Sequence, residues 1–343
     1  MFIDFTTVVK YAWMAYDTSR AIKSITDISA MVSTNHVYKV LLTNGSFVIA
    51  KITYFGRFEH FVEDHTIINV LANNLPAPFE NFLARSLISG TDLFVHRFQN
   101  KFVDAWVVFY KPIKISKRLP KRFDDEQINA MGKQFATFHQ VCTDIRNTLP
   151  NSSKTLQTDI HDLLYSIQSE DHEHRRYFDL LKRNCELFLE NTDKLGADKF
   201  PKIPVFVDWN IGNFSVTRTY KLFSRWDYDW FRMSSRILDF YFLSRIVSDI
   251  GDRTIFTYNI GTLMESRFLQ FLKSYHQEYP LQKNEVLFMK EAYRFFILHY
   301  VIKYGRYFFH EMYANKLQKE ALEQHLPSID NFDADRILRA LNI

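Results

Sequence analysis

The fold prediction for this chain rests on residues 204–232, PVFVDWNIGNFSVTRTYKLFSRWDYDWFR. A short apolar run at 205–207 ends at Asp208, and Gly212-Asn213 turns the chain into a second β-like run. A third run begins at Leu222 and ends in the acidic cluster 226–229. Functional side chains gather at strand ends and loops, and two acids with an asparagine can position a hydroxyl and hold a divalent cation. The alternative is a Gly-Asn turn in an acidic surface hairpin.

The spacing D-x-x-x-x-N, followed about a dozen residues later by an acid, matches the chemistry of phosphoryl transfer. The stretch resembles the catalytic hairpin of the aminoglycoside phosphotransferase and choline kinase-like families, which share the protein-kinase fold. Their usual pattern is H-G-D-x-x-x-x-N, then I-D-[FWP]-[DE]. Here F-V-D-W-N-I-G-N keeps Asp208 and Asn213 and has Phe206 at the usual His. S-R-W-D keeps Asp227 as the second acid and has Arg225 at the position of the first, metal-binding Asp.

Residues 37–51 predict the first hairpin of a small antiparallel sheet, because Asn44-Gly45 lies between two β-rich runs. In the resembled families, the loop over the nucleotide phosphates reads N-x-V-Y and is followed by a hairpin and a Lys, a form that Asn35 and Lys51 match. Further β-like runs complete the predicted sheet, at 83–88, 93–98 and 105–110. The weak helical spacing of residues 1–26 indicates a leading helix.

The resemblance implies that Lys51 pairs with the nucleotide phosphates and with a glutamate on the next helix. Glu63, Ile67 and Leu71 follow the i, i+4, i+8 spacing of one helix face, which predicts a helix over 61–71. Glu63 is the candidate partner of Lys51, and Glu59, one turn earlier, is the alternative. Outside this context, a lysine at a strand end is usually just solvated.

Beyond residue 111 the pattern becomes helical, with a helix from Asp124 or Asp125 through Phe138, a charge-rich helical insert at 155–195, and an aromatic-rich helix or helix pair at 285–326 that breaks at Gly305. We therefore predict an α+β, two-lobed protein-kinase-like fold. Its small antiparallel-sheet lobe would span 1–111 and its mainly helical lobe 112–343. In the resembled families, an acid at the position of Asp239 usually supports the catalytic loop by hydrogen bonding.

Composition adds limits to the function. The net charge of +4 permits anionic ligands such as nucleotides but does not point to DNA or RNA. The basic run at 114–122 has no interleaved aromatic residues, which favours a solvated linker over a nucleic-acid patch. With two cysteines, Asp4 ahead of any basic region and no apolar run of membrane-spanning length, we expect a cytoplasmic protein without a membrane partner.

The function that the resemblance implies is ATP-dependent phosphorylation of a hydroxyl on a small molecule, with ATP and Mg2+ as cofactors. Asp208 would orient and deprotonate the hydroxyl, and Asn213 and Asp227 would bind the metal. Lys51 would hold the nucleotide phosphates, positioned by Glu63, near a loop that contains Asn35.

The interpretation has two versions, which differ in the role of Arg225. An arginine stays protonated and has no acceptor atom, so it cannot ligate Mg2+. Side chains alternate along a strand, which predicts that Arg225, Asp227 and Asp229 share one face. In the catalytic version, Arg225 reaches a phosphate directly. In the alternative, Arg225 pairs with Asp227 or Asp229, and the chain is a degenerate kinase-like protein that binds a nucleotide or a protein partner without turnover.

Overall fold

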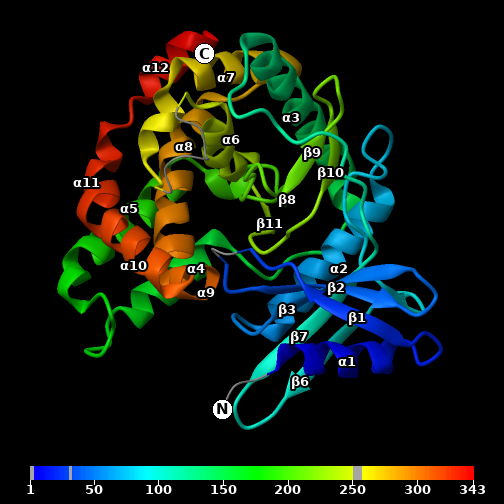
Figure 1. Cartoon of the computed structure of the whole chain (residues 1–343). Coiled ribbons are helices and arrows are strands. Elements are labelled where there is room, and N and C mark those ends of the chain that lie inside the picture. The colour runs from blue at the N-terminus through cyan, green and yellow to red at the C-terminus, as the bar shows by residue number, and fades with distance from the viewer. Residues whose placement is uncertain (1–3, 31–32, 250–256) are drawn as a thin grey trace.

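The computed structural model describes residues 4–30, 33–249 and 257–343. The N-terminal part is a five-stranded antiparallel sheet and the C-terminal part is mainly helical, which confirms the predicted α+β, two-lobed kinase-like fold (Figure 1). In sheet order, the five strands are β1 (Ile22–Asp27), β2 (His36–Leu42), β3 (Phe47–Thr53), β7 (Asp104–Tyr110) and β6 (Val95–Gln99). Three further antiparallel pairs join β4 (Ile88–Ser89) to β5 (Asp92–Leu93), β8 (Ile203–Val205) to β11 (Arg232–Ser234), and β9 (Phe214–Val216) to β10 (Leu222–Arg225).

Two helices belong to the N-terminal part, α1 (Phe5–Tyr16) and α2 (Phe58–Asn74). The α-helices of the C-terminal part are α3 (Asp125–Ile145), α4 (Leu156–Ser166), α5 (Phe178–Lys194), α6 (Phe240–Val247), α7 (Ser266–Glu278), α8 (Lys283–Phe296), α9 (Gly305–Phe308), α10 (Glu311–Glu320), α11 (Leu326–Ser328) and α12 (Ala334–Leu341). Short π-helical segments follow α8 at Ile297–Lys303 and α10 at Ala321–His325. None of the helices in the described ranges is long and apolar enough to cross a bilayer.

The predicted hairpin at 37–51 is confirmed. Strands β2 and β3 pair in register up to Leu41 opposite Phe47. Gly45 in the turn has φ +83°, a conformation that a side chain would strain. The predicted helices at 61–71 and 124–138 also form, inside α2 and α3, and Asp124 caps α3 through the backbone nitrogen of Gln127.

The leading helix was predicted too long, because α1 ends at Tyr16 and β1 follows it at the edge of the sheet. Ile22 and Ile25 both pack against the sheet core although they are three residues apart. The pairing of β1 with β2 shifts by one residue position between Ile22 and Ser24. Because of this irregularity, the apolar residues of β1 lie three apart, as in a helix, instead of two apart, as in a regular strand.

The predicted strand at 83–88 forms only isolated bridges, at Leu83 and Ser86, whereas the two later runs form β6 and β7. The backbone of this segment hydrogen-bonds first to the end of β10 and then to the sheet. Arg225 N donates to Phe82 O at 2.6 Å and Ala84 N to Arg225 O at 3.0 Å, and Leu87 N then donates to Phe109 O of β7 at 2.7 Å. This segment therefore joins the N-terminal part to the strand that leads into the acidic cluster.

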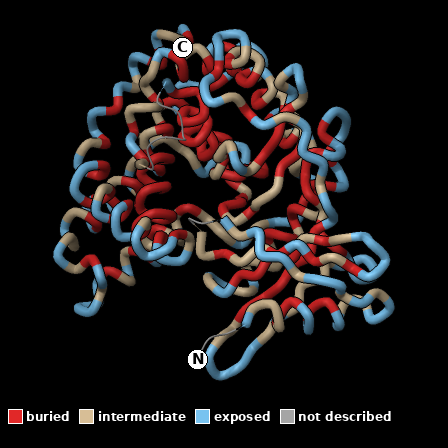
Figure 2. Tube along the Cα trace, viewed as in Figure 1, coloured by how far each residue is buried: buried red, intermediate tan, exposed pale blue. Residues whose placement is uncertain are grey.

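Two apolar cores lie on the two faces of the sheet. Along β7, Val107 and Phe109 belong to the core that α1 covers, while Val108 and Tyr110 belong to the larger core of the helical part. Figure 1 shows α1 and α2 on opposite sides of the strands, and the apolar side chains of α2 pack into the larger core. Figure 2 shows buried segments both in the sheet and in the helical part.

Candidate active site

A cleft of about 580 Å³ lies between the sheet and the helical part. One wall is apolar and comes mainly from the sheet and the chain that follows β7, with Ile28, Val37, Ile49, Ala84, Tyr110 and Ile113. The opposite end is polar, with Asn35, Lys51, Asp208, Asn213, Asp227 and Asp229. Five of the seven predicted site residues thus line one cleft. Glu63 and Arg225 are not among the described residues that line it.

The loop that carries Asp208 is held by the buried carboxylate of Asp239. Asp239 accepts hydrogen bonds from the backbone nitrogens of Phe206 and Val207, at 3.0 and 2.7 Å. Its second oxygen contacts His139 Nε2 at 3.0 Å, and His139 Nδ1 contacts the Tyr275 hydroxyl at 2.7 Å. Val207 has φ +58°, a conformation that is strained for a β-branched residue. The buried network therefore holds a loop conformation that the local sequence disfavours.

Asp208 lies directly after this strained residue and is oriented by its own loop. Asn213 Nδ2 donates to Asp208 Oδ2 at 2.9 Å, and the Asn210 backbone nitrogen donates to Asp208 Oδ1 at 3.1 Å. Asn213 O in turn accepts a hydrogen bond from Trp226 N at 3.0 Å. The predicted pair is therefore brought together, and its hairpin is joined to the acidic cluster.

Lys51 projects from β3 into this polar end. Its Nζ lies 2.9 Å from Asp227 Oδ1 and 2.5 Å from Asp229 Oδ1. Asn35 Nδ2, from the loop before β2, donates to Asp229 Oδ2. Lys51 is almost completely buried, whereas the Asp227 side chain is 37% exposed. Asp227 is therefore the acid of this cluster that is most accessible from the cleft.

The charged groups of the cluster shift one another's pKa values. Burial acts to lower the pKa of Lys51, but the charges of Asp227 and Asp229 outweigh it, so this pKa is raised. Burial acts to raise the pKa of Asp227, and Lys51 outweighs it, so that pKa is lowered. For Asp229, burial together with repulsion from Asp227 raises the pKa. The cluster therefore holds one firmly ionised acid, Asp227, beside one that takes up a proton more readily.

The position of Arg225 corrects the expected match to the family pattern. Strand β10 ends at Arg225, and Asp227 has φ +76°, so the predicted alternation of side chains stops there. Arg225 points into the interior and is 1% exposed. Two residues later, Trp226-Asp227-Tyr228-Asp229 matches I-D-[FWP]-[DE] at both acidic positions, with other aromatic residues at the remaining two. The geometry favours this match, since Asp227 and Asp229 both contact Lys51.

Neither version predicted for Arg225 describes its contacts. It is buried behind the loops instead of facing the cleft, so it does not reach a phosphate there. No ion pair joins it to the carboxylate of Asp227 or Asp229 in the part of the chain that the structure describes. Burial lowers the pKa of Arg225, against the opposing charges of Asp208 and Asp239.

Glu63 does not meet Lys51, which corrects the predicted pair. Glu63 Oε1 instead accepts hydrogen bonds from Ser152 Oγ at 2.7 Å and Ser153 N at 2.8 Å. The neighbouring Asp64 forms an ion pair with Lys154 Nζ at 2.6 Å. Glu63 and Asp64 therefore attach helix α2 to the segment before α4, while Lys51 has acids of the helical part as its partners.

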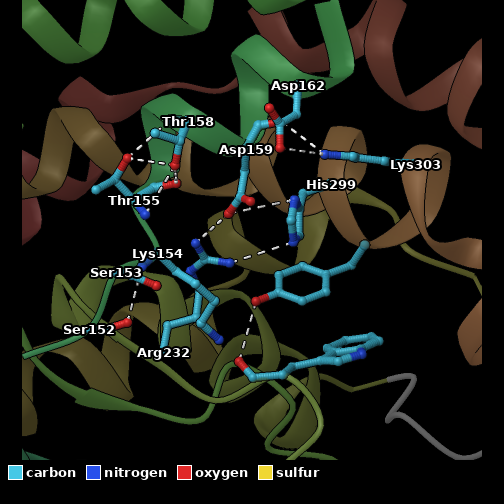
Figure 3. Close-up of polar contacts among 12 residues, drawn as sticks. Ser152, Ser153, Lys154, Thr155, Thr158, Asp159, Asp162, Arg232, His299 and Lys303 are labelled. Atoms are coloured by element: carbon cyan, nitrogen blue, oxygen red, sulfur yellow. Dashed lines mark hydrogen bonds and ion pairs between the residues drawn. The ribbon is translucent and has the colours of Figure 1, made fainter. Parts of the chain in front are cut away.

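A second polar cluster continues from Lys154, and sequence reasoning missed it (Figure 3). Lys154 Nζ also donates to Phe231 O at 3.0 Å, directly after the acidic cluster. Figure 3 shows Asp159 of α4 between Arg232 and His299; it forms an ion pair with Arg232, and its Oδ2 lies 3.8 Å from His299 Nδ1. These residues come from three distant parts of the chain, and no local spacing could have indicated them.

No protein-family model matches the chain. No curated protein matches its sequence. Among solved structures, it is similar to the amicoumacin kinase hAmiN in complex with AMP-PNP, Ca2+ and Ami, with a TM-score of 0.65 at 15% identity over 98% of this chain and 97% of that chain. It is also similar to a microcompartment-associated aminopropanol kinase, with a TM-score of 0.63 at 13% identity over 98% and 99% of the two chains.

A macrolide 2'-phosphotransferase type I gives a TM-score of 0.53 at 11% identity over 94% of this chain and 98% of that chain. The chain has the fold of these small-molecule kinases and phosphotransferases. The predicted kinase-like fold is thereby confirmed over nearly its whole length.

Proposed function

We propose that this protein is an ATP-dependent phosphotransferase that acts on a hydroxyl of a small molecule. One observation carries the proposal: Asp208, paired with Asn213, lines the same cleft as the acids held by Lys51. Phosphoryl transfer needs an acid that accepts or orients the hydroxyl, oxygen ligands for Mg2+ and a cation on the nucleotide phosphates. These groups all lie at one end of the cleft.

In this proposal, Asp208 orients the acceptor hydroxyl and takes its proton. Asn213 and Asp227 hold Mg2+, Asp229 is the second acid of the cluster, and Lys51 binds the phosphates once they displace its carboxylate partners. Asn35 lines the same cleft and holds Asp229 through its Nδ2, and we place it beside the bound nucleotide.

The donor set fits Mg2+. In the described part of the chain, no group of three or more His, Cys, Asp or Glu side chains forms a complete metal cage. Mg2+ is commonly held by one or two carboxylates together with phosphate oxygens and water, so a cage is not required. When bound, the metal would neutralise charge on the transferred phosphoryl group. The exposed carboxylate of Asp227 is the protein ligand best placed to receive it.

The apolar wall would receive the base of the nucleotide. It ends at the chain after β7, where Lys111 and Ile113 line the cleft at the junction of the sheet and the helical part, and we place the division between the two lobes at residue 111. The similar amicoumacin kinase structure contains AMP-PNP and Ca2+, which supports a nucleotide and a divalent cation in this cleft. The kinases and phosphotransferases with this fold support a small-molecule acceptor.

The test is ATP binding by calorimetry with and without Mg2+, followed by a screen of hydroxyl-bearing acceptors that measures ADP release. We expect Mg2+-dependent binding that Asp227→Asn abolishes, and acceptor-dependent ADP release. ATP binding that is indifferent to Mg2+, with no ADP release for any acceptor, would instead support the binding protein without turnover.

A further inference from the structure

Arg225 is a buried cation that packs against two aromatic rings. Its guanidinium carbon lies 4.5 Å from the ring centre of Phe206 and 4.2 Å from that of Trp209. Both rings belong to the loop around Asp208. The π face of an aromatic ring attracts a cation, and the attraction grows when both are removed from water. The rings therefore give Arg225 its site behind the loop.

The same guanidinium bridges the two segments that carry the proposed chemistry. Arg225 Nη2 donates to the backbone carbonyl of Asp208 at 2.9 Å and, more weakly, to that of Asp227 at 3.4 Å. The backbone nitrogen of Arg225 donates a hydrogen bond to Phe82, and its backbone oxygen accepts one from Ala84. One rigidly held side chain thus connects the loop of Asp208 to the loop of Asp227.

A structural role alone does not explain a charge at this position. The Nε and Nη1 groups of Arg225 have no hydrogen-bond partner within the described ranges. Unpaired buried donors cost free energy, and apolar residues of similar volume often serve a buried site as well or better. What an apolar side chain cannot supply is a hydrogen bond to both loops.

We infer that Arg225 is a positioning residue that holds Asp208 and Asp227 at their working separation. This inference rests on the proposed phosphotransferase function. Phe206, which departs from the His of the family pattern, is one of the two rings that bind Arg225. The departure therefore provides an aromatic face for the guanidinium, and Phe206 and Arg225 act as one unit instead of marking a lost active site.

The test compares Arg225→Met, which removes every donor, with Arg225→Lys, which keeps the charge but cannot reproduce the planar stacked fork. We expect kcat to fall roughly 100-fold in Arg225→Met, because small misplacements of reacting groups have effects of this size. The KM for ATP should change less than about threefold, since Arg225 does not line the cleft. Thermal stability should stay close to that of the wild type.

Arg294→Met is the matched control. Arg294 is equally buried, but it pairs with Glu291 in α8, so its loss should lower thermal stability and leave kcat of the folded protein unchanged. Wild-type kcat in both Arg225 variants would overturn the inference. If Arg225→Met does not fold, Arg225→Lys decides by the same criterion.

Hydrogen–deuterium exchange separates this inference from the proposed function. If the wild type releases no ADP with any acceptor, the proposed function fails, and exchange at residues 206–213 and 226–229 still tests Arg225. Faster exchange of both segments in the Arg225 variants supports the positioning role. Unchanged exchange overturns it.

Discussion

Two lysines with largely buried side chains connect the N-terminal part to the helical part, in opposite directions. Lys51 of β3 reaches Asp227 and Asp229 in the helical part, at 2.9 and 2.5 Å. Lys154, which precedes α4, reaches Asp64 of α2 at 2.6 Å. Each lysine side chain is nearly removed from solvent. The two sites therefore resemble each other in geometry and differ in the number of acids.

The pKa values of the two lysines are shifted in opposite directions. Burial acts to lower the pKa of both amines. At Lys51 the two carboxylates outweigh burial and raise the pKa. At Lys154 burial and the charge of Arg232 outweigh Asp64, and the pKa is lowered. With both acids ionised, the Lys51 cluster carries an excess negative charge that a metal ion can take up. The Lys154 pair is balanced, as expected for a contact that holds two parts of the chain together.

The largest effect is expected on the Lys51 side, where the chemistry is proposed. Asp208→Asn keeps the size of the side chain and removes the base. Turnover should fall by about 10²–10⁴-fold, the usual contribution of a general base, with ATP affinity nearly unchanged. Steady-state ADP release and calorimetry measure the two quantities. Asp64→Asn, on the Lys154 side, is the control, and its turnover should stay near that of the wild type.

The second effect is expected on stability at the other lysine. Lys154→Met leaves Asp64 buried without its cation, which typically costs about 3–5 kcal/mol of unfolding free energy. Urea denaturation measures this loss. The double variant Asp64→Asn/Lys154→Met removes both charges and should recover most of it. A double variant no more stable than Lys154→Met would show that the ion pair does not attach α2 to the helical part.

The third prediction is that a change at Lys51 affects ATP binding more than stability. Lys51→Ala should weaken ATP binding by about 10–100-fold, in line with the loss of roughly 1.5–3 kcal/mol from a hydrogen bond to a charged group. Its melting temperature should fall less than that of Lys154→Met, because Asp227 remains accessible to water and the raised pKa of Asp229 lets that acid take up a proton. A sharp fall in melting temperature at unchanged ATP affinity would make Lys51 structural instead.

The comparison also separates what the sequence could predict from what it could not. The hairpin turn at Gly45 and the Asp208–Asn213 pair are local, since each depends on residues that are close in the chain and on one backbone conformation. The edge strand β1 was missed because an irregularity in its pairing disguised its period.

The partner of Lys51 could not be found in this way. Glu63 has the expected helical position, but α2 is placed by Ser152 and Lys154, which lie about 90 residues further along the chain. The match around Arg225 failed for a related reason. Two alignments that differ by two residues keep an acid at Asp227. They are distinguished by the burial of Arg225 and by the contacts of Asp227 and Asp229 with Lys51, which only the structure shows.

The smallest effect concerns the pH dependence of stability. Burial raises the pKa of Asp64 from 3.8 to about 6, against the charge of Lys154. Because the folded chain binds this proton more tightly than the unfolded chain, the stability that Asp64 contributes is complete below about pH 3.8 and is lost as the pH rises through about 6. Between pH 4 and 7, the unfolding free energy of the wild type should therefore fall relative to that of Asp64→Asn, by roughly 2 kcal/mol.

Denaturant titrations across this pH range measure the difference between the two proteins. Asp162→Asn provides the control, because Asp162 is 71% exposed and lies 3.7 Å from Lys303 in the same polar region. Its curve should run parallel to that of the wild type. If the Asp64→Asn curve also runs parallel, burial does not dominate at Asp64, and the two lysine sites would then differ less than their surroundings imply.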